Sequence, residues 1–279
     1  MSIRFSPIVS AKTRNQGGMF WVKAIDLHDL AEAASPVTVL DDFRVRGQPF
    51  SPHPHAGFSA VTYVFEDSEG KLRSRDSIGN DVVVSPGGIV WTQAGKGVIH
   101  HEIPADDRVL HGLQLFVNLS ARNKLIEPRM LRLMPCEVPE YGNDGGDRVR
   151  VIVGAFEGRL SPLVPPEPFT FLDSQLRRAI HFDLPVGHNA LFYLVSGAIA
   201  IRSGNSALKM AGGHAVAAHG SGGHIDIEAL AVSHVIILSA PDLNEPMVVE
   251  GPFIMNEQAQ INAAVARYQS GAMGRLAPL

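Results

Sequence analysis

Short runs of β-branched and aromatic residues recur along this chain, and a glycine or a proline closes most of them. Ala60–Phe65 and Val232–Leu238 are typical runs, and Gly79-Asn80 and Gly204-Asn205 are typical turns. The 279 residues include 27 glycines and 19 prolines, which divide the chain into short segments. Many short strands separated by turns are characteristic of β-sandwiches and β-barrels. The pattern therefore predicts an all-β fold of antiparallel strands.

The chain divides into two halves of similar texture. Residues 134–147 contain two prolines, three glycines and several charges without hydrophobic periodicity, which is typical of a linker. On its two sides, Val61–Asp67 and Leu191–Gly197 repeat the same run of apolar and aromatic residues. We expect an N-terminal domain over residues 1–134 and a C-terminal domain over residues 148–279, arranged as two tandem barrels.

Two short segments concentrate residue types that bind metals. One contains His53 and His55, the other contains His100 and Glu102, and both pairs have the same i, i+2 spacing. Because side chains alternate along a strand, each pair would lie on one face of its strand. If the two strands are neighbours with these faces turned inward, three imidazoles and one carboxylate meet. Such a set suits iron, manganese, nickel, copper or zinc.

These segments, and much of the chain between and after them, resemble the signature of the pirin family, a branch of the cupin superfamily. The resemblance implies a bicupin, with two tandem antiparallel jelly-roll barrels and a C-terminal helix. The matching stretches are His53–Phe58, Val61–Tyr63, Arg75–Asn80, Pro86-Gly87, Ala94–Pro104, His111–Leu119 and Gly251–Asn256.

The resemblance also implies which residues hold the metal. By position they are His53, His55, His100 and Glu102, and they would bind one divalent transition metal in the N-terminal domain. Iron(II) is the favoured ion, with manganese, nickel, cobalt, copper and zinc as alternatives. His101 lies between two of these ligands in sequence and should point to the opposite face. The histidines of residues 148–279 form no His-x-His or His-x-Glu pair, so we expect no metal there.

The sequence departs from the pirin pattern at four places. Ala56, Ser59, Ser74 and Gly88 occupy positions where many pirins carry arginine, glutamate, histidine and aspartate. None of the four is a predicted ligand, so the predicted metal site is unaffected. The changes leave the polarity of the substrate pocket and the range of substrates open.

Pirin relatives are known as flavonol (quercetin) 2,3-dioxygenases, so the resemblance implies a dioxygenase. Its substrates would be a flavonol, or another small aromatic enol, and O2. Glu102 would have a second task, since a carboxylate beside a metal can accept the enol proton as a general base. Candidate walls of the substrate pocket are Phe43, Phe50, Phe58, Trp91, Gln93, Gln114 and Phe116.

A second class of function fits the same site. Eukaryotic pirins resemble iron-containing transcription co-regulators, so the chain could be a non-enzymatic redox sensor whose metal alters a surface that a protein partner recognises. A different metal-dependent reaction on a small enol or sugar is a third reading, because cupin barrels host many chemistries.

Composition excludes several other classes. The formal net charge is −4 and no basic run occurs, so we expect no direct binding of nucleic acid. The single cysteine, Cys136, rules out an internal disulfide and favours a reducing compartment. The N-terminus lacks the apolar run of a signal peptide, and Ser233 and His234 interrupt the longest apolar stretch, at Ala229–Ala240. We therefore expect a cytoplasmic protein without a membrane segment.

The C-terminus contains the clearest helical pattern. Asn256 is a suitable N-cap, and Gly271 is a suitable stop signal. A second, short helix is predicted near residues 26–34. The residues that form one apolar face of the C-terminal helix are Ile261, Ala264, Val265 and Tyr268.

Overall fold

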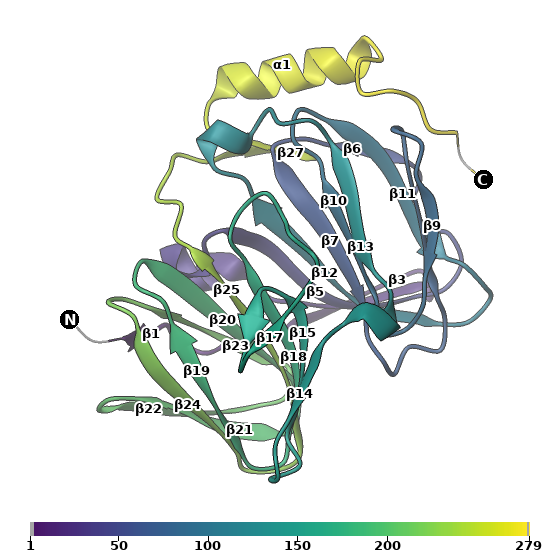
Figure 1. Ribbon diagram of the computed structural model, residues 1–279. Coiled ribbons are helices and arrows are strands. Elements are labelled where there is room, and N and C mark those ends of the chain that lie inside the picture. The colour runs from purple at the N-terminus through teal and green to yellow at the C-terminus, as the bar shows by residue number, and fades with distance from the viewer. Residues whose placement is uncertain (1–2, 278) are drawn as a thin grey trace.

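A computed structural model describes residues 3–277 and 279 of the chain. This part forms 27 strands, one α-helix at the C-terminus and three short 3-10 helices, so the predicted all-β class is confirmed. The strands build two domains, each made of a large and a small antiparallel sheet packed face to face (Figure 1). The expected barrels are therefore flattened jelly rolls.

The first domain pairs a seven-stranded sheet with a four-stranded one. The large sheet has the order β13 (Arg129–Leu133), β10 (Ile89–Gln93), β7 (Phe58–Val64), β12 (Leu110–Asn118), β5 (Val37–Val45), β4 (Phe20–Ala24) and β3 (Lys12–Gln16). The small sheet has the order β6 (His53–His55), β11 (Val98–Pro104), β8 (Leu72–Asp76) and β9 (Asp81–Val84).

The second domain repeats this plan. Its large sheet has the order β1 (Arg4–Phe5), β23 (His214–His219), β20 (His188–Ser196), β25 (Ser233–Pro241), β18 (Thr170–Leu176), β15 (Arg148–Val153) and β14 (Glu140–Gly142), and β2 (Val9–Ser10) also pairs with β23. Its small sheet has the order β19 (Ala179–Leu184), β24 (Gly223–Ala229), β21 (Ala198–Ser203) and β22 (Ser206–Ala211). The remaining elements are β16 (Ala155–Phe156), β17 (Arg159–Leu160), β26 (Val248–Glu250), β27 (Phe253–Met255), η1 (Leu27–Ala34), η2 (Ala121–Asn123), η3 (Pro135–Glu137) and α1 (Gln258–Gln269).

The largest apolar core lies between the two domains. It joins buried residues of both large sheets, including Trp91 and Leu115 from the first domain and Phe171 and Leu191 from the second. Separate cores fill the space between the large and small sheet of each domain. Each large sheet is therefore buried on both faces over much of its width, which leaves little freedom for strands to slip in register.

Two tyrosines bond reciprocally across this interface. The hydroxyl of Tyr63 in the first domain donates to Asp173 of the second at 2.5 Å, and the hydroxyl of Tyr193 in the second donates to Asp42 of the first at 2.8 Å. All four residues are at most 2% exposed. Tyr63 and Tyr193 belong to the two stretches whose sequences resemble each other. Each copy of the repeat therefore supplies a tyrosine that bonds to an aspartate of the other domain.

The two ends of the chain cross to the opposite domains. Strands β1 and β2 pair with β23 of the second domain, although they begin the chain. At the other end, β27 and α1 pack on the first domain, where Ile254 N–H donates to the Ala56 carbonyl at 3.0 Å. The fully buried Lys124 ties this C-terminal arm down by donating to the carbonyls of Gly57 and Ile254, at 2.8 and 2.9 Å. The domain boundaries expected from the sequence, residues 1–134 and 148–279, stay a prediction.

The predicted helices are present with small shifts. The C-terminal helix begins at Gln258 with Glu257 as its N-cap, one residue later than Asn256, because the side chain of Gln260 folds back to accept from the N–H groups of both residues. Ile261 and Ala264 are buried on the predicted face, whereas Tyr268 at its end is 43% exposed. The short helix near residues 26–34 is the 3-10 helix η1.

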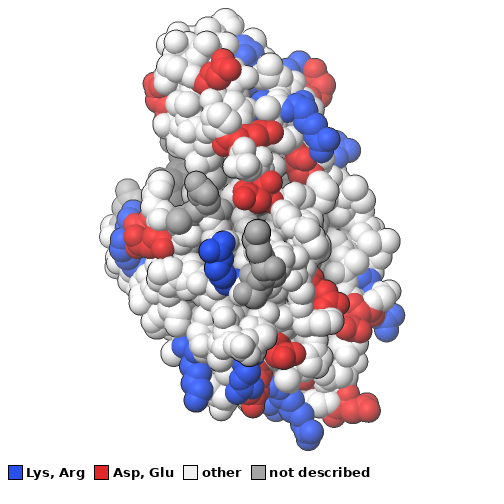
Figure 2. All heavy atoms as spheres, turned by 90° about the vertical axis from the view of Figure 1, so that its left-hand side faces the viewer, with Lys and Arg blue, Asp and Glu red and all other residues white. Residues whose placement is uncertain are grey.

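The surface agrees with the modest net charge. Among the described residues on the face shown in Figure 2, acidic and basic side chains are interspersed over a mostly uncharged surface. None of the helices in the described part of the chain has the length and apolar character to span a bilayer.

Replacing Tyr193 with phenylalanine tests the interface, because it leaves the buried carboxylate of Asp42 with one donor fewer. We expect Tyr193→Phe to lower the free energy of unfolding by about 1.5–3 kcal/mol, the range for hydrogen bonds to charged groups. Tyr268→Phe is the matched control on an exposed side chain and should change it by less than about 0.5 kcal/mol. Urea denaturation measures both values. A Tyr193→Phe variant with the free energy of unfolding of the wild type would show that the reciprocal bonds do not stabilise the fold.

Candidate metal centre

The candidate site begins with the pairing of two short strands. β6 lies at the edge of the small sheet and runs antiparallel to β11, with His53 directly opposite His100. Pro54 is tolerated in β6 because an edge strand can accommodate a residue without an N–H. Gly57 closes this segment at φ +83°, and a Cβ there would lie 1.8 Å from the Ile254 carbonyl oxygen. The turn after the histidines therefore requires glycine.

The structure brings three of the four predicted ligands together. Each of His53, His55 and His100 offers a ring nitrogen, and these atoms all lie within 4.8 Å of one another. The Nε2 atoms of His53 and His100 are 3.2 Å apart. Within the described residues, this is the one group of histidine, cysteine or acidic side chains compact enough to hold an ion.

The hydrogen bonds of these rings favour the tautomer that a metal needs. Nδ1 of His53 lies 2.8 Å from the Ser51 carbonyl oxygen, and Nδ1 of His55 lies 3.4 Å from that of Pro252. If each Nδ1–H donates to its carbonyl, the Nε2 lone pair is free to coordinate, the usual arrangement around metal-binding histidines.

Burial keeps His55 and His100 neutral. Burial, together with the neighbouring His53, lowers the pKa of His55 to about 3. Burial also lowers the pKa of His100 well below its ordinary value, with His55 and His53 adding to the effect. The Nε2 atoms of His53 and His100, 3.2 Å apart, cannot share a hydrogen bond if both present lone pairs, whereas a cation between them satisfies both. The residues present therefore fit a transition metal.

Glu102 lies beside the histidines but outside their cluster. Its carboxylate accepts hydrogen bonds from Thr62 at 2.5 Å and from Ser74 at 3.2 Å. Burial raises the pKa of Glu102 to about 7, and the two hydrogen bonds oppose the rise. The roles of Glu102 as ligand and as general base stay predictions. His101 points elsewhere, with Nε2 3.0 Å from the Phe50 carbonyl oxygen.

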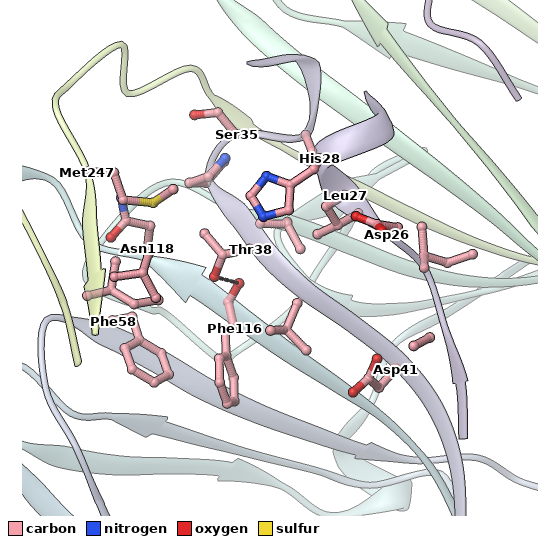
Figure 3. Close-up of a pocket in the computed structure, with 18 of the residues that line it drawn as sticks. Asp26, Leu27, His28, Ser35, Thr38, Asp41, Phe58, Phe116, Asn118 and Met247 are labelled. Atoms are coloured by element: carbon pink, nitrogen blue, oxygen red, sulfur yellow. Dashed lines mark hydrogen bonds between the residues drawn. The ribbon is translucent and has the colours of Figure 1, made fainter. Parts of the chain in front are cut away.

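A cavity of about 1370 Å³ lies next to the metal site, although none of His53, His55, His100 and Glu102 lines it (Figure 3). Phe58 and Phe116 line it and also contact His55, with ring centroids 4.9 and 5.2 Å from the imidazole. β3, β4 and β5 supply one wall, and η1 and the segment 242–251 supply others. Three of the charged side chains that line the cavity come from β3 and β5, where no sequence motif marked them: Lys12, Arg14 and Asp41.

Of the seven predicted pocket walls, only Phe58 and Phe116 line this cavity. Trp91 faces the other domain and packs on Phe169, with ring centroids 5.3 Å apart, so its assignment to the pocket was wrong. The other four serve different contacts: Phe43 is in the core between the sheets, Phe50 packs on Phe20, Gln93 donates to the Glu127 carbonyl, and Gln114 accepts from Thr62.

The structure explains some of the departures from the pirin pattern. Ala56 is fully buried against Phe253 of the C-terminal arm, which leaves no space for a larger residue. A Cβ at Gly88 would lie 2.5 Å from Val84, so a side chain has no space there either. Ser74 supplies one of the two donors to Glu102.

Fold and site together define a two-domain cupin with a three-histidine centre in its first domain. Residues 9–117 match the Pirin family domain and residues 171–274 match the Pirin C-terminal cupin domain. A pirin-like protein of tomato (Solanum lycopersicum) is 32% identical over 95% of this chain and 91% of its own. A putative quercetin 2,3-dioxygenase of Pseudomonas aeruginosa is 32% identical over 87% of this chain and 88% of its own. The chain belongs to the pirin family.

Solved structures share the fold. A quercetin 2,3-dioxygenase from Acinetobacter baumannii superimposes with a TM-score of 0.87 over 99% of this chain and 100% of its own, at 23% identity. The bacterial pirin YhhW of Escherichia coli, in complex with nickel(II), superimposes with a TM-score of 0.66 over 85% of this chain and 99% of its own, at 21% identity. At these identities the likeness establishes the arrangement of strands.

Neighbouring histidines on one strand give a matched test of the ligand set. His100→Ala removes one of the three clustered imidazoles, so we expect purified protein to lose stoichiometric metal. His101→Ala alters a side chain outside the cluster and should keep one metal per chain. Elemental analysis after dialysis measures both, and full metal content in His100→Ala would refute the assignment.

Proposed function

We propose that this chain is a metal-dependent dioxygenase of the flavonol 2,3-dioxygenase type, acting in the cytoplasm on an aromatic enol and O2, with iron(II) as the favoured metal. His53, His55, His100 and Glu102 would hold the metal. The observation that carries the proposal is a cluster of three imidazoles, two of them buried with lowered pKa values, together with a carboxyl group of pKa about 7 on the strand of His100, next to a cavity that Phe58 and Phe116 line.

The metal, when bound, supplies a Lewis acid that acidifies the enol hydroxyl and a redox-active centre for O2. The protein residues bind and orient the substrate. Phe58 and Phe116 offer flat apolar contact beside His55, where a planar ring system can lie with water excluded. Both oxygen atoms of O2 would enter the ring-opened product, and one ring carbon would leave as carbon monoxide.

Glu102 is suited to accept the enol proton. A pKa of about 7 matches a base that must take up and release a proton near neutral pH. Thr62 and Ser74 hold the carboxylate in place by donating to its two oxygens. Once the carboxylate is protonated it can act as a donor in turn, so the same pair of hydroxyls can stabilise both states by rotating.

Oxygen uptake and carbon monoxide release test the activity directly. A panel of flavonols should be turned over by protein loaded with iron, manganese, nickel, cobalt or copper. If no metal form turns over any flavonol, the dioxygenase proposal fails. An oxidation-dependent protein partner in that case would identify the chain as a redox sensor.

Glu102→Gln tests the base. The amide keeps the size of the side chain but cannot take up the proton, so metal-reconstituted variant should bind substrate and turn over about 10²- to 10⁴-fold more slowly. His101→Ala, on the opposite face of the same strand, is the control and should keep most of the activity. If Glu102→Gln retains both metal and wild-type turnover, Glu102 is not the base.

A further inference from the structure

The cavity has a second polar end whose role is unassigned. Asp41 lines it from β5, and in Figure 3 its carboxylate lies apart from Phe58 and Phe116. No side chain among the described residues donates a hydrogen bond to this carboxylate in the structure. Its neighbour on β4 is Ala24, which has no polar side chain to offer. Arg14 acts on Asp41 only as a nearby charge.

The environment of Asp41 makes this carboxylate unusual. Burial raises the pKa of Asp41 to about 6, and the charge of Arg14 opposes the rise. The carboxylate is therefore partly buried, and no described side chain donates a hydrogen bond to it. Such a group destabilises the fold unless something else supplies a donor, and a ligand in the cavity is placed to do so.

The register of the large sheet relates Asp41 to the metal site. Asp41 lies directly opposite Gln114 on β12, and Gln114 lies directly opposite Thr62 on β7. Asp41 therefore lies two strands across the same sheet face from Thr62, which donates to Glu102 on the other sheet. With adjacent strands about 4.8 Å apart, the backbones of Asp41 and Thr62 are about 10 Å apart. A substrate that reaches both Asp41 and the metal site is therefore longer than a single ring.

We propose that Asp41 is a specificity-determining residue that accepts a hydrogen bond from a hydroxyl group at the end of the substrate remote from the metal. This inference rests on the proposed function, because it assumes that the substrate binds between the metal site and this cavity end. It requires a substrate of more than one ring, with a phenolic hydroxyl at the end remote from the enol. A site that holds an acceptor without a protein donor discriminates against analogues that lack the matching donor.

Binding without turnover tests the proposal. Metal-loaded protein under argon is titrated with three flavonols that carry the enol hydroxyl alone, phenolic hydroxyls on one outer ring, or phenolic hydroxyls on both. Wild-type protein should bind the better of the two phenolic flavonols about 10- to 100-fold more tightly than the flavonol with the enol hydroxyl alone, the range expected for a hydrogen bond to a charged group. Asp41→Asn should reduce this preference to less than about threefold.

Asp26→Asn is the matched control. Asp26 also lines the cavity, but its carboxylate is already satisfied by Lys12 at 2.8 Å, so the variant makes the same chemical change without removing a free acceptor. It should keep the wild-type preference. Asp41→Asn should also raise the melting temperature at pH 7.5, because it removes a desolvated charge, whereas loss of a structural carboxylate would lower it.

Each outcome decides the question. Wild-type preference retained in Asp41→Asn overturns the proposal, and so does equal weakening of all three flavonols together with a lower melting temperature. Equal or absent binding of the three by wild-type protein also overturns it. An Asp41-dependent preference without oxygen uptake supports this inference and refutes the dioxygenase instead. Turnover of flavonols whose binding does not depend on Asp41 supports the dioxygenase and overturns this inference.

Discussion

The face-to-face packing of the two large sheets is the constraint on which the site depends. Side chains alternate along a strand, so a residue that faces the other domain determines what its neighbours present to the cavity. On β7, Tyr63 faces the second domain and donates to Asp173, which turns Thr62 towards Glu102. A slip by one residue would exchange these positions and break two buried hydrogen bonds, so the interface stabilises the register of the site.

Desolvation then shapes the chemistry. Burial favours neutral imidazoles in His55 and His100 and a protonated carboxyl in Glu102, because each charged form loses hydration. Neutral histidines are good metal ligands, and a carboxyl with a pKa near 7 is a good proton acceptor at physiological pH. The C-terminal arm contributes to this burial, since Pro252 supplies the acceptor for His55 and Ile254 closes over Gly57. Residues about 200 positions away therefore complete the surroundings of the first histidine segment.

The sequence predicted the elements whose signal is local. The all-β class follows from frequent turns, the family follows from stretches near the histidines, and the spacing of His53, His55 and His100 matches two paired strands. Pocket walls were harder to predict because β10 is buried on both faces, so its residues show no apolar–polar alternation that would assign Trp91 to one side. The crossing of both chain ends has no local signal at all, since it depends on pairing between residues more than 190 apart.

Asp41 and Asp42 show most clearly why register, rather than residue type, decides function here. They are adjacent and chemically identical. Asp42 bonds to Tyr193 and His111 at the domain interface, whereas Asp41 lines the cavity without a protein donor. The interface acquires a satisfied buried carboxylate, which stabilises the fold, and the cavity acquires an unsatisfied one, which is available to a ligand. The chain itself fills the space that larger side chains at Ala56 and Gly88 would need. If the proposed function holds, discrimination among substrates falls to the rest of the cavity, where β3, β4 and β5 provide walls and Asp41 provides a charge.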